Sequence, residues 1–141
     1  MAERLLRHVL ARAGVDRVQA ESAGVFAIAG MGPTRETMRV LQDAGVDCSD
    51  HHARVLTAQM VDEADLVFVM EQFQLEEVLR RAPSARGKVH LLKPYHLTEG
   101  DVMHPNIPDP IGKPLEVYEV CFADIRDAIE RVSRSLGVRS A

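Results

Sequence analysis

Asp109 is the side chain of this sequence that is best placed to do chemistry. It lies between Pro108 and Pro110, and the two prolines hold the backbone extended on both sides of the carboxylate. Gly112 follows and lets the chain turn sharply. A carboxylate that a loop holds at a fixed point suits general acid catalysis. A proline-rich surface turn is the alternative, and for an isolated Asp-Pro pair it would be favoured.

A second candidate is the segment from Cys48 to Arg54, which contains a possible nucleophile and a possible anion-binding guanidinium. This segment contains no glycine, whereas a phosphate nest needs backbone freedom to turn its N–H groups inward. Asp50 would lie among the phosphate oxygens and repel them. We therefore attribute the spacing to chance and do not expect Cys48 to be a nucleophile.

The composition indicates one soluble domain. At 141 residues the chain can bury a core, and its 46% hydrophobic and 27% charged residues are typical of globular proteins. A net charge of -4 argues against a nucleic-acid partner. No apolar run approaches the roughly 20 residues of a membrane span. Met1-Ala2-Glu3-Arg4 begins no signal peptide, so we expect a cytoplasmic protein with no membrane partner.

Neither a metal nor a cofactor is expected. His90, His96 and His104 do not have the spacing of a zinc site, so scattered surface histidines are the better interpretation. The two cysteines, Cys48 and Cys121, are too few for a disulfide framework.

The elements that must position these residues alternate between helices and strands. Apolar residues three and four positions apart predict helices over residues 1–13, 33–44, 57–64, 71–82 and 115–136. Short apolar runs predict strands over residues 17–21, 66–70 and 88–92. This alternation predicts an α/β doubly wound parallel sheet. In such sheets the first strand and the loop after it usually form the ligand site, but this sequence opens on a helix.

Landmarks along nearly the whole chain resemble those of the low-molecular-weight protein phosphatase family, which includes tyrosine and arginine phosphatases. In order, they are Met1-Ala2-Glu3, Ser22-Ala23-Gly24, His51-His52-Ala53-Arg54, Ala64-Asp65-Leu66-Val67 leading to Met70, Asp109-Pro110 and Val117-Tyr118. Ser22 to Ala27, together with Gly100-Asp101-Val102, looks especially like the bacterial arginine-phosphatase branch. The resemblance implies a flavodoxin-like sheet of order 2-1-3-4. It also implies hydrolysis of phosphotyrosine or phosphoarginine, on a protein or a small aryl phosphate, through a phosphocysteine intermediate.

In that family a strand and a loop of the form Cys-(x)5-Arg-Ser-Pro precede the first helix. The cysteine attacks phosphorus, and the arginine holds the phosphate oxygens. Met1 stands where the residue after Ser-Pro would be, so we expect a single domain, residues 1–141, that is incomplete at its N-terminus. The first central strand and the nucleophile would then be absent, and the chain would be inactive as given.

Two alternatives to a truncated phosphatase remain open. The chain could be a non-enzymatic homologue that acts as a binding or dimerisation module, and a dimer would then form through the sheet edge that the missing strand uncovers. An unrelated phosphosugar or nucleotide enzyme on a flavodoxin-like sheet has only fold-level support. Arsenate reductase, a relative on the same fold, would need two further cysteines, and there are none between Glu71 and Val120.

The resemblance also gives roles to particular residues. Asp109 matches the general acid and base, provided that a phosphate loop is supplied. Ser22 and His51 match a serine and a histidine that support an asparagine of that loop, so both would hold it rigid. Ile111 takes the place of the aromatic residues with which tyrosine phosphatases of the family wall the substrate ring. The motif Asp-Pro-x-Gly looks more like the arginine branch.

Overall fold

The computed structural model describes residues 1–98 and 104–138, so Gly100-Asp101-Val102 lies outside the described residues. In chain order the helices are α1 (Ala2–Arg12), α2 (Arg35–Asp43), α3 (Ala58–Glu63), α4 (Gln72–Arg81) and α5 (Leu115–Ser135). The strands are β1 (Val67–Val69) and β2 (Val89–Leu91), and a short 3-10 turn, η1 (Pro83–Ala85), follows α4. All the predicted helices are confirmed, with bounds within two residues of those expected.

Local side-chain chemistry explains where several helices begin and end. The hydroxyl of Thr34 accepts a hydrogen bond from the backbone N–H of Thr37 at the start of α2. Thr57 does the same at the start of α3. At the start of α4, Glu71 forms a capping box with Gln74. Because the sequence within each turn sets these contacts, they were predictable without knowledge of the tertiary fold.

The described sheet has two parallel strands. Val67 pairs with Val89, and Val69 pairs with Leu91, with α4 as the crossover between the strands. Both strands are shorter by one residue at each end than the sequence predicted.

The strand predicted over residues 17–21 is wrong. Exposed and half-buried side chains alternate along this segment, as in a strand that covers a core on one face. However, residues 16–23 make no backbone–backbone hydrogen bond in the described part of the chain. A strand exists only where a neighbour exchanges hydrogen bonds with it, and the described residues provide no such neighbour for this segment. The nearest substitute is an isolated parallel bridge between Gly24 and Val55.

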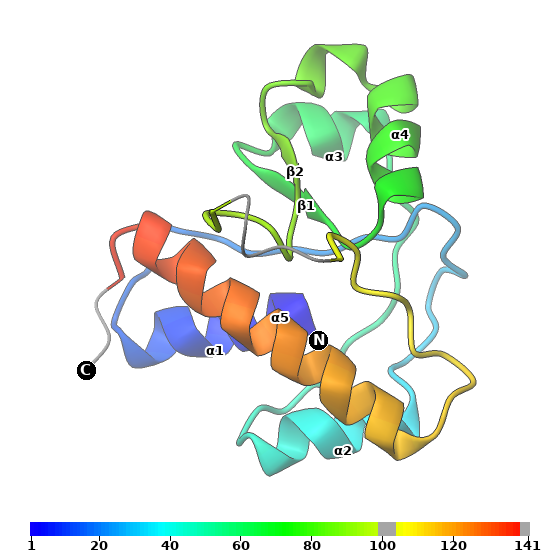
Figure 1. Cartoon of the computed structure of the whole chain (residues 1–141), viewed down its shortest axis with the longest axis vertical. Coiled ribbons are helices and arrows are strands. Elements are labelled where there is room, and N and C mark those ends of the chain that lie inside the picture. Colours follow the sequence, from blue (N-terminus) through cyan, green and yellow to red (C-terminus); the bar gives the residue numbers. More distant parts are fainter. Residues whose placement is uncertain (99–103, 139–141) are drawn as a thin grey trace.

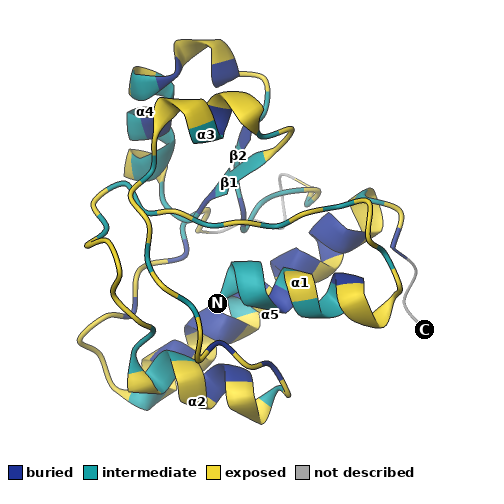
Figure 2. Ribbon diagram, turned by 180° about the vertical axis from the view of Figure 1, so that it is seen from behind, coloured by how far each residue is buried: buried dark blue, intermediate teal, exposed yellow. Residues whose placement is uncertain are grey.

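Helix α5 organises the larger part of the core. It lies across α1 and α2, while β1, β2, α3 and α4 form the upper part of the molecule in Figure 1. Its buried face, dark blue in Figure 2, carries the predicted side chains Tyr118, Cys121, Phe122, Ile125, Ile129 and Val132. A second cluster joins α3 and α4 to the strands through residues such as Val61, Val69, Val78 and Val89. None of the described helices combines the length and apolar composition that crossing a membrane requires.

Candidate functional site at the start of α1

The carboxylate of Glu3 is the centre of a polar cluster at the first turn of α1. Ser22 donates a hydrogen bond from its hydroxyl to Glu3 Oε1 at 3.1 Å. The Nδ1 atom of His51 lies 3.5 Å from Glu3 Oε2. The Glu3 side chain is only 8% exposed, so both contacts are shielded from water. Thus two residues predicted to support the phosphate loop do come together, although in this structure they meet at Glu3.

Two arginines of α1 surround the same carboxylate. Arg4 Nε lies 3.2 Å from Glu3 Oε2, and Arg7 Nη2 lies 3.6 Å from Glu3 Oε1. Arg4 also pairs with Asp50, with Nη1 2.9 Å from Oδ1. Yet Glu3 Oε2 and Arg4 Nε are buried without a properly directed hydrogen bond. Their proximity is therefore an ion-pair contact that leaves hydrogen-bonding capacity unused on both atoms.

Sequence analysis missed Glu3 and both arginines as members of the site. The available signal was an acid in the first turn of an amphipathic helix with arginines one and four positions later. That pattern occurs on many solvated helix faces, and only the tertiary structure shows that Ser22 and His51 close over it.

Burial lowers the pKa of His51 below its ordinary value, and the Glu3 carboxylate opposes this shift. The ring is therefore neutral at pH 7. The His51 Nδ1 atom is thus in polar contact with Glu3 Oε2 at 3.5 Å without a hydrogen bond between them.

A short backbone pairing holds the segments that carry Ser22 and His51. The N–H of Gly24 donates to Arg54 O at 2.8 Å, and the N–H of Leu56 donates to Gly24 O at 2.9 Å. Arg54 adds hydrogen bonds from Nε and Nη2 to Ser22 O at 3.3 and 3.2 Å. A Cβ atom at position 24 would lie 2.6 Å from the Cβ of Ala27, so glycine is required for this turn.

Asp109 lies on an exposed loop that precedes α5. Its Oδ1 accepts a hydrogen bond from the N–H of Ile111 at 3.0 Å. Gly112 completes the turn with a φ of 78°. Upstream, Ile107 is 1% exposed, and its N–H donates to Met70 O at 2.9 Å. The loop therefore presents the carboxylate to solvent from a buried anchor.

Cys121 connects this loop to the start of α1. Its Sγ lies 3.9 Å from Pro108 O, and it shares a core cluster with Met1. Burial raises the pKa of the Cys121 thiol to about 11, and the charges of the amino terminus and Asp109 both act on it. Asp109 and the N-terminus of α1 are thus both neighbours of one buried thiol.

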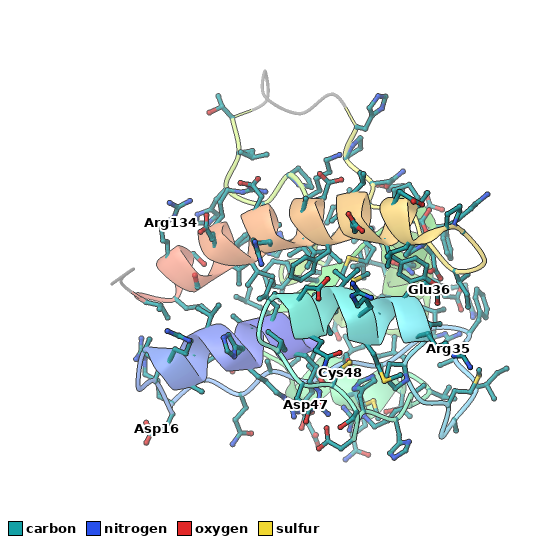
Figure 3. The ribbon with its side chains drawn as sticks, turned by 90° about the horizontal axis from the view of Figure 1, so that it is seen from below. Asp16, Arg35, Glu36, Asp47, Cys48 and Arg134 are labelled. Carbon is teal, nitrogen blue, oxygen red and sulfur yellow. The ribbon has the colours of Figure 1, made fainter. Side chains whose placement is uncertain are left out.

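Cys48 does not form a phosphate site with Arg54. Cys48 is 3% exposed, and burial raises the pKa of its thiol. Figure 3 shows Cys48 and Asp47 on the segment that follows α2. The Asp47 carboxylate accepts from the N–H of Ser49 at 2.9 Å, while Arg54 is engaged with Ser22 O and Glu21. The two side chains therefore do not converge on a common anion.

Two further features describe the surroundings of the site. Ile111 is 64% exposed, so its side chain is available to a ligand near Asp109.

Within residues 1–98 and 104–138, no group of three or more His, Cys, Asp or Glu side chains is arranged to hold a metal ion.

Comparison with known proteins identifies the family. Residues 1–139 match the sequence pattern described as low molecular weight phosphotyrosine protein phosphatase, and the chain belongs to this family. Its α/β fold agrees with that membership.

Curated relatives include both tyrosine and arginine phosphatases. The probable low molecular weight protein-tyrosine-phosphatase EpsP of Ralstonia solanacearum is 33% identical over 130 residues, which cover 92% of this chain and 81% of EpsP. A protein-arginine-phosphatase of Geobacillus stearothermophilus is 31% identical over 120 residues, covering 84% and 77% of the two chains.

The fold is also similar to that of solved arginine phosphatases. A structure of the YwlE arginine phosphatase, a cysteine-to-serine variant with a phosphorylated active-site serine, superposes with a TM-score of 0.85 at 26% identity. The match covers 96% of this chain and 86% of that one.

Proposed function

We propose that this chain carries the acid and the supporting residues of a cytoplasmic protein phosphatase that hydrolyses phosphotyrosine or phosphoarginine. The observation that carries the proposal is the meeting of Ser22 and His51 at the first turn of α1, where the family holds its phosphate loop. The relatives named as tyrosine and arginine phosphatases support the same chemistry.

In this proposal the reaction has two displacement steps. A cysteine thiolate forms a bond to phosphorus, and the bond from phosphorus to the leaving oxygen or nitrogen breaks while Asp109 donates a proton to the leaving atom. Asp109 then takes a proton from water, whose oxygen bonds to phosphorus as the sulfur–phosphorus bond breaks. A phosphocysteine intermediate thus separates the two steps, and phosphate is the product.

The nucleophile must come from a Cys-(x)5-Arg loop before α1. The 141 residues contain this spacing only at Cys48 to Arg54, whose side chains point to different partners. We therefore propose that residues 1–141 form one domain that is inactive without such a loop. The accompanying strand would fill the central position of a 2-1-3-4 sheet, between β1 and residues 17–21.

The start of α1 is suited to receive a phosphate loop. The α1 helix has 11 residues, and backbone N–H groups at a helix N-terminus favour a bound phosphate. The Met1 amino group is held against the core, and burial lowers its pKa.

Ile111 would form one wall of the substrate pocket. An exposed aliphatic side chain gives apolar contact without aromatic stacking, so it accepts the flexible side chain of phosphoarginine as well as an aryl ring. Phosphorylated protein side chains are the proposed substrates, and small aryl phosphates are convenient probes.

A binding or dimerisation module is the second candidate. The observation that favours it is that residues 16–23 make no backbone–backbone hydrogen bond within the described part of the chain. A second copy could pair with this edge, because unpaired strand edges are templates for association.

Hydrolysis of para-nitrophenyl phosphate by two proteins tests the enzymatic proposal. One is the 141-residue chain, and the other is the same chain joined to a strand and a Cys-(x)5-Arg-Ser-Pro loop. We expect vanadate-sensitive turnover only from the extended chain. Turnover by the 141-residue chain would contradict the need for the loop, and a folded but inactive extended chain would contradict the phosphatase assignment. A stable dimer of the 141-residue chain, with no activity in either protein, would favour the binding module.

A further inference from the structure

Arg81 is the last residue of α4, and its guanidinium reaches two loops that are remote in sequence. Its Nη2 donates to Val25 O at 3.2 Å, and its Nη1 donates to Leu56 O at 3.4 Å. Neither carbonyl accepts a backbone hydrogen bond in the described part of the chain. One side chain thus satisfies two otherwise unused acceptors and ties both loops to α4.

Those two loops are the ones that carry Ser22 and His51. Val25 and Leu56 flank the Gly24–Val55 bridge, so the guanidinium closes the end of this short backbone pairing. The pairing is too small to be rigid alone, because it consists of an isolated bridge rather than a strand ladder. Its geometry therefore depends on side chains that bind both segments.

Glu77 keeps the guanidinium of Arg81 in place. Arg81 Nε donates to Glu77 Oε1 at 2.8 Å, one helical turn earlier in α4. Hydrogen bonds from Arg80 and Arg81 hold the pKa of Glu77 at about 2, so the carboxylate stays charged at neutral pH. The Arg81 side chain is 24% exposed, against 70% for Arg80, which touches neither loop carbonyl.

We propose that Arg81 is a positioning residue of this site, which locks the paired loops so that Ser22 and His51 meet at Glu3. The importance of this role for catalysis rests on the proposed phosphatase function, but the positioning itself does not. Arg81 touches no reacting atom in this account and acts only through the loops.

The test compares two variants of the 141-residue chain, Arg81→Met and the matched control Arg80→Met. Both remove a guanidinium that binds Glu77 from α4, but only Arg81→Met frees the carbonyls of Val25 and Leu56. Amide hydrogen exchange at Gly24 and Leu56 should become about tenfold faster or more in Arg81→Met and stay unchanged in Arg80→Met. Arg81→Lys should restore part of the protection, because one ammonium can reach one carbonyl.

A second readout follows His51 itself by NMR titration. In Arg81→Met its pKa should rise toward the ordinary value of about 6.5, because a looser loop buries the ring less. Unchanged exchange and an unchanged His51 titration in Arg81→Met would overturn the proposal. Equal effects in both variants would also overturn it, since they would reflect a general weakening of α4. Neither measurement requires enzymatic turnover, so the result is independent of the phosphatase assignment.

Discussion

The hydroxyl of Ser22 lies 3.1 Å from Glu3 Oε1 and donates a hydrogen bond to it across 19 positions of sequence. This contact joins an irregular loop to the first turn of α1 and, with His51, surrounds one buried carboxylate. Glu3 therefore contacts both residues that the resemblance predicts to support a phosphate loop. A supplied loop would have to share or replace these contacts.

Removing the charge of Glu3 should lower both the free energy of unfolding and the pKa of His51. In Glu3→Gln the partly buried guanidinium of Arg4 keeps Asp50 but loses the carboxylate beside its buried Nε, which should cost about 1–3 kcal/mol of unfolding free energy. The pKa of His51 should fall further, because the Glu3 carboxylate of the unmodified chain raises this pKa and the variant lacks it. Chemical denaturation and NMR titration measure the two effects. Glu21→Gln, which removes an exposed pair with Arg54, should change stability by no more than about 1 kcal/mol.

Stability should decrease as the pH falls below about 6.5, because of His51. Its pKa is lower in the folded chain than in the unfolded chain, so protons bind the unfolded state more tightly. The full contribution is present above the unfolded pKa and is lost as the pH drops toward the folded pKa, with a slope of at most about 1.4 kcal/mol per pH unit. Urea unfolding between pH 8 and pH 5 measures this slope.

Two histidine variants assign the pH dependence to its source. His51→Gln should reduce the slope, and the slope that remains belongs to the Met1 amino group, whose pKa burial also lowers. His52→Gln, which alters an exposed neighbour near Gly30 O, should leave the profile unchanged. The low pKa of Glu77, about 2, places its own acid effect below pH 4.5 and outside this window. An identical slope in His51→Gln would show that another group titrates.

The helices were predictable from sequence because their causes are local. Thr34 and Thr57 cap within three residues, and the buried stripe of α5 follows from spacing alone. The strand over residues 17–21 could not be predicted in the same way. Its alternation of exposure is present, but strand formation depends on a neighbour that lies elsewhere in the chain or outside it.

The site was predictable only in part, for a similar reason. The resemblance pointed to Ser22 and His51, and their closeness follows from a bridge between segments about 30 residues apart. Nothing in the spacing of Glu3 marks it as their meeting point. Likewise, Arg81 looks like any solvated arginine at a helix end until its two carbonyl partners are seen.

Both thiols should be unreactive in the folded chain. Cys48 and Cys121 are 3% and 8% exposed, and burial raises the pKa of each. At pH 8 a thiol with a pKa of about 11 is thiolate in only about one molecule in a thousand. Iodoacetamide should therefore label the native chain at least about 100-fold more slowly than the chain in guanidinium. Rapid labelling of Cys48 in the native chain would contradict this prediction and would make Cys48 a candidate nucleophile.

Ile111 should influence the choice between phosphotyrosine and phosphoarginine. In the chain extended by a phosphate loop, Ile111→Tyr supplies a ring that can pack against the substrate ring, worth about 0.5–1.5 kcal/mol. The ratio of kcat/KM for phosphotyrosine over phosphoarginine peptides should rise by roughly 2- to 12-fold, because each 1.4 kcal/mol is a factor of ten. Ile111→Leu keeps an aliphatic wall and should leave the ratio unchanged. An unaltered ratio in Ile111→Tyr would place the wall elsewhere.

Asp109→Asn should separate proton transfer from binding in the same extended chain. An asparagine can still accept the hydrogen bond from Ile111 N–H, so the exposed loop should keep its shape. It cannot donate the proton that a tyrosine oxygen needs, so kcat for phosphotyrosine should fall by about 10²–10⁴. A nitrophenyl leaving group needs less protonation, so kcat for nitrophenyl phosphate should fall much less. The affinity for vanadate should change little, because binding needs no proton transfer. An equal fall in kcat for both substrates would show that Asp109 is not the general acid.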